Sequence, residues 1–162
     1  MSQTDRLLID AFLAEKRIAF VGVSRGSKDF SRMLFRELAG RGYDVVPVHP
    51  EAAEIEGVPA FRTVLEIPAP RPRAALLLNP PQASEQVVRE CAEAGIEMVW
   101  LYKSVALGAV TPEAVVAAKS LNLKVVAGEC PFMFLPNPGL IHALHRGFRR
   151  ITGTLPLAPP RA

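Results

Sequence analysis

The 162-residue sequence has little cysteine, no long apolar run and only a small excess of one charge. Cys91 and Cys130 are too few and too isolated for a disulfide framework or a structural zinc site. The longest apolar runs, such as RIAFVGV, are far shorter than the roughly 20 residues that span a membrane. The amino terminus lacks a basic flank before an apolar core, so we expect no signal peptide and a cytoplasmic protein.

The charge balance indicates the kind of partner. Lys and Arg number 19 against 16 Asp and Glu, which gives a formal net charge of +3. This mild excess suits an anionic small ligand at least as well as nucleic acid, because dedicated nucleic-acid binders usually carry a denser basic stripe. We therefore expect a small nucleotide ligand and neither nucleic acid nor a membrane as partner. A homo-oligomer stays open.

Apolar runs typical of buried strands alternate along the chain with segments of helical periodicity. The strands are expected at 17–23, 43–50, 73–79, 97–102 and 124–129, and the helices at 4–16, 30–38, 82–95, 111–122 and 140–150. This alternation predicts an α/β fold, a doubly wound parallel sheet of the Rossmann type. The first helix and the basic last helix are additions to it.

The remaining segments are weaker in pattern. Residues 51–72 predict an irregular crossover with a short helical turn near Thr63 to Glu66. We expect a single domain over residues 1–154, followed by a Pro-rich tail over 155–162.

The turn after the first expected strand carries the clearest binding signal. In a doubly wound sheet, ligands bind beyond the carboxyl ends of the strands, where this turn commonly lies. Gly22 lets the backbone approach a ligand, and the amides that begin the next helix can receive phosphate oxygens. Ser24 adds a hydroxyl, while Arg25, Lys28 and Arg32 add positive charge. The turn therefore predicts a site for a diphosphate or a terminal phosphate.

Two other interpretations of this turn were weighed. Residues 22–26 match the G-x-S-x-G elbow of serine hydrolases, but that elbow follows several strands, whereas this turn follows the first. We interpret Ser24 as an anchor, not a nucleophile. A nicotinamide-dependent redox enzyme or sensor stays as the alternative, although the G-x-G-x-x-G pattern is incomplete. The second strand also ends in Val48-His49-Pro50, without the acidic residue that binds the ribose hydroxyls.

Five segments in order resemble the CoA-binding protein family, whose fold is similar to the CoA-binding domain of the succinyl-CoA synthetase α subunit. They are IAFVGVSRGSKDFS, GYDVVPVHPEAAEIEGVPAF, LLLNPP, AGIEMVWL and ECP, and the resemblance covers about residues 12 to 135. It implies noncatalytic binding of coenzyme A or an acyl-CoA, because catalysis in the synthetase depends on a phosphorylated His in a further domain.

The resemblance also implies which residues bind the ligand. The implied phosphate loop comprises Gly22, Val23, Ser24, Arg25 and Lys28. The border of the adenosine comprises Val48, His49 and Pro50, with His49 where the family more often has Asn. The loop beside the pantetheine or diphosphate comprises Asn79, Pro80 and Pro81.

A few isolated residues invite other functions. We interpret Cys91 and Trp100 as core residues and Cys130 as structural, although a mixed disulfide with a ligand thiol is an alternative for Cys130. His142 and His145 are interpreted as part of a basic helix face and not as metal ligands, since no third ligand is evident nearby.

Overall fold

A computed structural model of the chain describes residues 6–103 and 108–135. Its central sheet has five strands in the order β2-β1-β5-β6-β7, and every neighbouring pair is parallel. The strands are β1 Arg17–Val21, β2 Asp44–Val48, β5 Ala74–Leu77, β6 Met98–Leu101 and β7 Lys124–Ala127. The strand order reverses between β1 and β5, as in doubly wound domains. The predicted fold class is confirmed.

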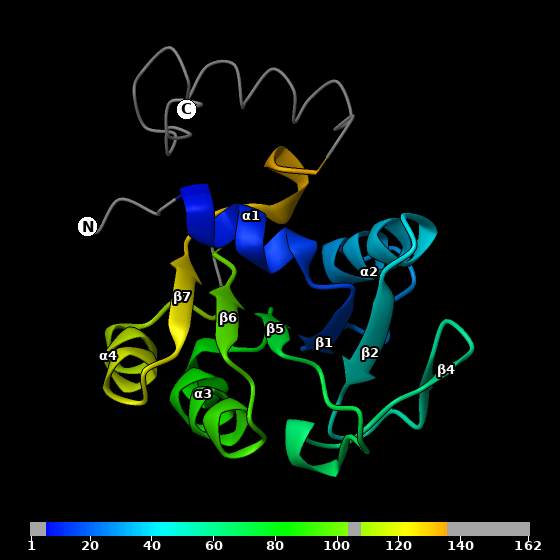
Figure 1. Ribbon diagram of the computed structural model, residues 1–162. Coiled ribbons are helices and arrows are strands. Elements are labelled where there is room, and N and C mark those ends of the chain that lie inside the picture. Colours follow the sequence, from blue (N-terminus) through cyan, green and yellow to red (C-terminus); the bar gives the residue numbers. More distant parts are fainter. Residues whose placement is uncertain (1–5, 104–107, 136–162) are drawn as a thin grey trace.

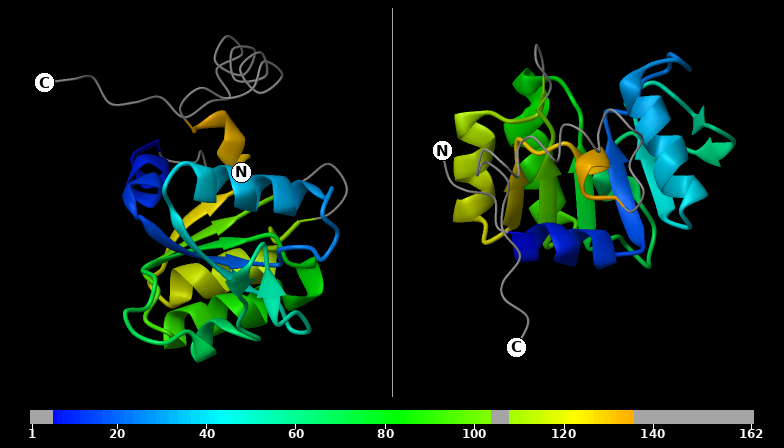
Figure 2. Two further views of the ribbon diagram at one scale, coloured as in Figure 1. Left: turned by 90° about the vertical axis from the view of Figure 1, so that its right-hand side faces the viewer. Right: turned by 90° about the horizontal axis from the view of Figure 1, so that it is seen from above.

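The helices form a layer on each face of the sheet (Figures 1 and 2). Helices α1 (Arg6–Ala14) and α2 (Phe30–Gly40) cover one face, and α3 (Ser84–Glu93) and α4 (Pro112–Ser120) cover the other. The described residues also include three single helical turns: η1 Val64–Glu66, η2 Pro81–Ala83 and η3 Pro131–Met133. The predicted helix at 140–150 and the Pro-rich tail lie outside the described residues.

Two apolar layers hold the sheet between its helices. Alternate side chains of each strand point to opposite faces, so Phe20 packs on the α1–α2 side and Val21 on the α3–α4 side. Trp100 is fully buried, and its ring lies edge-on to Phe12 at 5.2 Å between centroids. Cys91 is also fully buried, and this burial raises the pKa of its thiol to about 12. Both were predicted as core residues, which is confirmed.

The crossover between β2 and β5 is more ordered than predicted. The helical turn expected near Thr63 to Glu66 is present as η1, but a small antiparallel hairpin precedes it. Its strands are β3 Glu54–Ile55 and β4 Val58–Pro59. Two-residue strands are too short to produce a periodic pattern, which is why they could not be predicted from the sequence. The turn residue Glu56 has a φ of +53°, and its side chain reaches back toward α2.

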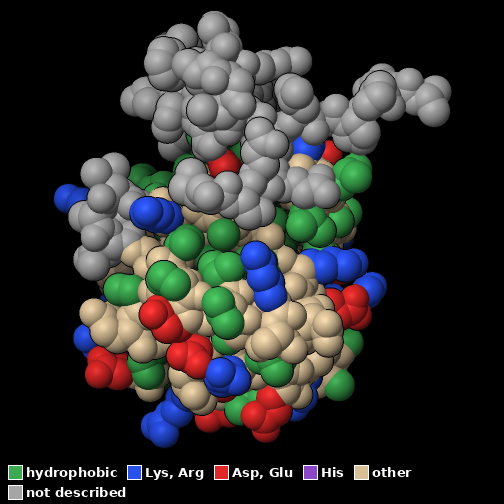
Figure 3. All heavy atoms as spheres, turned by 90° about the vertical axis from the view of Figure 1, so that its left-hand side faces the viewer, with side chains coloured by type: hydrophobic (Ala, Val, Ile, Leu, Met, Phe, Trp, Pro, Cys, Tyr) green, Lys and Arg blue, Asp and Glu red, His purple; other side chains and the backbone are tan. Residues whose placement is uncertain are grey.

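The length of the helices and the charges of one face can be compared with the sequence-based expectations. Within residues 6–103 and 108–135, no helix combines the length and apolar character needed to cross a bilayer. On the face that carries α4 and the edge strand β7, acidic and basic side chains are interspersed (Figure 3). A basic stripe is therefore not formed on this face.

Candidate functional site

A cleft of about 500 Å³ opens at the carboxyl edge of the sheet, where β1 and β5 lie next to each other. The ends of β1, β2 and β5 form one side of it, and η1 and α3 form the other. The lining residues are 21–25, 48–51, 62–64, 79, 80, 83, 86, 87 and 90. The cleft thus lies at the switch point of the strand order, the usual ligand position in this architecture.

The structure brings most of the predicted site residues together in this cleft. Gly22, Val23, Ser24 and Arg25 line it, as do the predicted residues that follow β2 and β5. Lys28 and Pro81 are not among the lining residues. Lys28 is exposed on the outer part of the first loop, and Pro81 begins η2.

Gly22 is required where β1 passes closest to the end of β5. Its φ is +84°, and a Cβ atom at this position would lie 2.4 Å from the backbone nitrogen of Asn79. The Gly22 N–H donates to the Val48 carbonyl at 3.2 Å, and the Leu78 N–H donates to the Val21 carbonyl at 2.8 Å. Close backbone approach therefore joins the ends of three strands at the base of the cleft.

Ser24 closes the first loop on itself. Its hydroxyl donates to the Asp29 carboxylate and accepts from the Gly26 N–H at 3.0 Å, while the Ser24 N–H donates to Ser31 Oγ at 2.8 Å. The hydroxyl proton is therefore engaged within the loop and is not directed to a ligand phosphate. Because its partner is a carboxylate and not an imidazole, the geometry also lacks the base that a nucleophilic serine needs.

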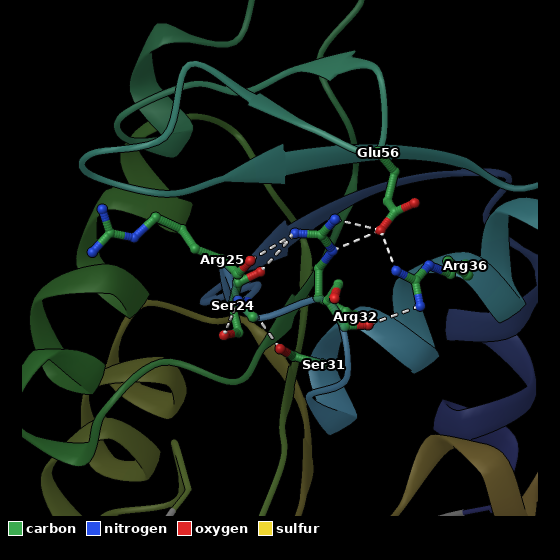
Figure 4. Close-up of polar contacts among 8 residues, drawn as sticks. Ser24, Arg25, Ser31, Arg32, Arg36 and Glu56 are labelled. Atoms are coloured by element: carbon green, nitrogen blue, oxygen red, sulfur yellow. Dashed lines mark hydrogen bonds and ion pairs between the residues drawn. The ribbon is translucent and has the colours of Figure 1, made fainter.

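Two arginines of α2 hold the same loop from outside the cleft (Figure 4). Arg32 donates to the carbonyls of Ser24 and Arg25 at 3.2 and 3.3 Å. Arg36 donates to the Ser27 carbonyl at 2.9 Å. The sequence suggested that Arg32 adds positive charge for a ligand, but the structure uses its guanidinium to fix the loop.

Glu56 orients both of these arginines from the hairpin turn. Arg32 pairs with its carboxylate, and Arg36 pairs with it at 2.7 Å. These three residues are called the Glu56 cluster below. Hydrogen bonds from Arg36 and Arg32 lower the pKa of Glu56 from 4.5 to about 2, so the carboxylate stays charged at neutral pH. The hairpin that the sequence did not reveal therefore supports the first loop.

His49 has a specific role at the end of β2. Its Nδ1 accepts hydrogen bonds from the N–H groups of Glu51 and Ala52, both at 3.0 Å. An asparagine side chain makes the same kind of bond to the backbone in turns. Since Nδ1 is an acceptor, Nε2 carries the proton and is the remaining donor of the ring.

Asn79 contributes a buried amide to the opposite side. The residue is 5% exposed, and its Nδ2 donates to the Pro80 carbonyl at 2.9 Å and to Ser84 Oγ at 3.0 Å. Its Oδ1 is buried and has no hydrogen-bond partner among the described residues. Buried acceptors are rarely left unpaired, so this position suits a hydrogen-bond donor.

Sequence reasoning missed the wall formed by η1 and α3. Arg62 and Thr63 enter the cleft because Phe61 lies beside the end of β2, where the His49 N–H donates to the Phe61 carbonyl at 2.9 Å. Gln86 and Glu90 enter from α3, joined by a hydrogen bond of 3.0 Å. The sequence carries no periodic signal for this contact between β2 and the crossover, because a single bridge forms it.

Comparison with known proteins identifies the family. The profile of the CoA binding domain family matches residues 16–136. This chain belongs to the CoA binding domain family. The resemblance expected from the five sequence segments is thereby confirmed, and association with CoA is the family's general property.

One curated relative shares part of this domain. The α subunit of ADP-forming acetate–CoA ligase II from Pyrococcus furiosus is 31% identical over 93 residues, which are 57% of this chain and 20% of the ligase subunit. The chain thus spans about a fifth of the length of this relative.

Solved structures share the fold. A hypothetical protein from Pyrococcus horikoshii OT3 is 27% identical with a TM-score of 0.70, covering 81% of this chain and 94% of its own. A conserved hypothetical protein from Pyrococcus furiosus is 28% identical with a TM-score of 0.63, covering 71% and 95%. A dinucleotide forming acetyl-coenzyme A synthetase from Ca. Korarchaeum cryptofilum has a TM-score of 0.63 at 23% identity, covering 75% of this chain and 27% of the synthetase.

Proposed function

We propose that the chain binds coenzyme A or an acyl-CoA in the cleft between β1, β2 and β5, and that it does so without catalysing a reaction on it. The observation that carries the proposal is the convergence of three loops, residues 22–25, 48–50 and 79–80, on one cleft. Each loop follows a different strand, and the cleft lies at the switch point of a CoA binding domain.

The polar groups of the cleft suit the parts of such a ligand. The Gly22 backbone lines the cleft at the carboxyl end of β1, where a diphosphate commonly lies in this architecture. The Nε2–H of His49 is a donor beside the expected ribose, and the buried Oδ1 of Asn79 suits an N–H group such as those of the pantetheine amides. The apolar walls, which include Val48, Val64 and Val87, suit the adenine ring and the pantetheine carbons.

The noncatalytic part of the proposal is supported by what the reactive groups already bind. The Ser24 hydroxyl donates to Asp29, and the Nδ1 of His49 accepts from two backbone N–H groups. Neither residue forms the nucleophile–base pair that acyl transfer needs.

One observation favours a second candidate, binding of a nicotinamide dinucleotide. Glu51 lines the cleft two residues after His49, and a carboxylate near the end of the second strand can bind ribose hydroxyls. Its carboxylate instead pairs with Arg25 at 3.2 Å, which favours CoA as the ligand.

Native mass spectrometry after incubation with equal concentrations of CoA, acetyl-CoA, NAD and NADP tests the proposal. We expect retention of CoA, acetyl-CoA or both. Retention of a nicotinamide dinucleotide alone would support the second candidate, and retention of none of the four would overturn both. Consumption of acetyl-CoA by the protein in solution would contradict the noncatalytic role.

A further inference from the structure

Arg62 stands in the cleft on the side of β2, in a fixed backbone position. Phe61 before it is tied to β2 on both sides, since its N–H donates to the Pro47 carbonyl at 3.0 Å and its carbonyl accepts from His49. The Arg62 N–H itself donates at 3.1 Å to the carboxylate of Glu66, the last residue of η1. The guanidinium therefore extends from an anchored base beside the end of β2.

The Arg62 guanidinium also differs from its neighbours in what it binds. Arg25, the other arginine of the cleft, is paired with Glu51, and Arg32 and Arg36 are held by Glu56. Within the described residues, no carboxylate or carbonyl pairs with the Arg62 side chain. Of the acids that line the cleft, Glu51 is neutralised by Arg25, and Glu90 accepts from Gln86.

We propose that Arg62 binds the phosphate on the ribose of the ligand, so that the cleft selects a phosphorylated adenine nucleotide over its unphosphorylated form. In doubly wound domains the residues at the end of the second strand face the ribose, and a nearby arginine accommodates a ribose phosphate. The planar guanidinium can donate two parallel hydrogen bonds to phosphate oxygens, which makes the contact specific as well as attractive. This inference rests on the proposed function and names the group that the site recognises.

The other cations are less suited to this position. Lys28 is exposed on the outer loop and does not line the cleft, while Arg25 belongs to the loop after β1, on the diphosphate side. The charge of Arg62 is thus placed where the ribose is expected, and its guanidinium pairs with no acid among the described residues.

Titration calorimetry with CoA and with dephospho-CoA, which lacks only the ribose phosphate, tests the inference on the full chain. We expect the wild-type protein to bind CoA more tightly than dephospho-CoA by about tenfold or more, as for a charge-assisted hydrogen bond. Arg62→Ala should remove this preference by weakening CoA alone, and Arg62→Lys should restore part of it. Unchanged binding of dephospho-CoA shows that the variant cleft is intact.

Arg89→Ala is the matched control, because Arg89 is an exposed arginine of α3 that pairs with Glu85 outside the cleft. It should leave both affinities unchanged. An equal loss for both ligands in Arg62→Ala, or no loss for either, would overturn the role of Arg62 while leaving the proposed function in place. Failure of the wild-type protein to bind either ligand would instead overturn the proposed function, and this inference with it.

Discussion

Two arginines near the carboxyl edge of the sheet, Arg32 and Arg62, differ in what their guanidinium groups already bind. Arg32 donates to two loop carbonyls and pairs with Glu56, and its side chain is 13% exposed. Arg62 lines the cleft, and its guanidinium pairs with no acid within the described residues. Figure 4 shows that the Arg25 side chain, which pairs with Glu51, points away from Arg32 and Glu56.

This contrast separates support of the site from contact with the ligand. A cation whose hydrogen bonds and charge are satisfied inside the protein has little left to offer an anion, however close it lies in sequence to a phosphate loop. The Glu56 cluster is then part of the scaffold, and the cleft residues make the contacts. Substitutions in the scaffold and in the cleft distinguish these two roles.

The backbone at the base of the cleft should tolerate change least. Gly22→Ala places a Cβ atom against the Asn79 backbone in a left-handed conformation, so we expect a loss of at least about 3 kcal/mol of unfolding free energy and no measurable CoA binding. Chemical denaturation and calorimetry measure both effects. Gly42→Ala is the control, because Gly42 has the same φ of +84° but no atom within 4 Å of its Cβ position. It should cost only about 1–2 kcal/mol and leave CoA affinity unchanged.

The Glu56 cluster should affect binding indirectly. Glu56→Gln removes the carboxylate that orients Arg32 and Arg36, so the first loop loses part of its support. We expect CoA affinity to fall about fivefold, as for the loss of one hydrogen bond. Glu97→Gln is the control, because it removes the surface ion pair of Glu97 with Arg73 at the amino ends of β5 and β6. An equal loss of affinity in both variants would show that the Glu56 cluster has no particular role in the loop.

The lowered pKa of Glu56 also predicts that the stability of the fold depends on pH. The pKa of Glu56 is lowered from 4.5 to about 2 in the folded protein, so the unfolded chain binds this proton more readily. Its contribution is fully present above about pH 4.5 and is lost as the pH falls toward about 2. Urea denaturation of wild type and Glu56→Gln across this range should show two curves that converge at low pH. A constant difference down to pH 2 would contradict the assigned role.

A smaller change is expected at the end of β2. His49→Asp places a carboxylate beside the expected ribose, which should disfavour a ribose phosphate and favour a ribose diol. We expect CoA affinity to fall by less than about fivefold and the ratio of NAD to NADP affinity to rise. Asn is the matched substitution, since it can keep the bonds to the N–H groups of Glu51 and Ala52 without adding charge. The same ratio in His49→Asp and His49→Asn would place the ribose elsewhere.

Lys28 should give the smallest effect. Its side chain is exposed outside the cleft, so we expect Lys28→Ala to weaken CoA binding by no more than about threefold, mainly through long-range charge that salt screens. Titration at low and high ionic strength checks this. A loss of tenfold or more that persists at high salt would show that the ligand phosphates lie on the outer loop, as the sequence suggested.

The fold was predictable because the sheet strands other than β7 are buried on both faces over most of their length. Such strands, as at 17–21 and 98–101, appear in the sequence as continuous apolar runs between helical segments. The turn at Gly22 was predictable for a related reason, since a glycine directly after the first strand is where backbone must approach a ligand.

The remaining part of the site was not predictable, because it depends on single contacts between distant segments. Arg62 enters the cleft through one bridge between Val48 and Phe61, and Glu56 reaches α2 from a hairpin of two-residue strands. Neither the bridge nor the hairpin produces a periodic pattern in the sequence. The sequence also cannot show that the Ser24 hydroxyl and the Arg32 guanidinium are satisfied within the loop, since that follows from side-chain geometry.

The most direct test of the account is an NMR titration of the ¹⁵N-labelled protein with CoA, which follows backbone amides and arginine side-chain N–H groups together. We expect the largest shifts at residues 22–25, 49–51, 62–64 and 79, with the Arg62 side-chain signal among them and those of Arg32 and Arg36 nearly unchanged. Shifts centred on residues 26–29 and on Arg32 and Arg36, with the cleft unaffected, would contradict it. So would the absence of any shift at saturating CoA.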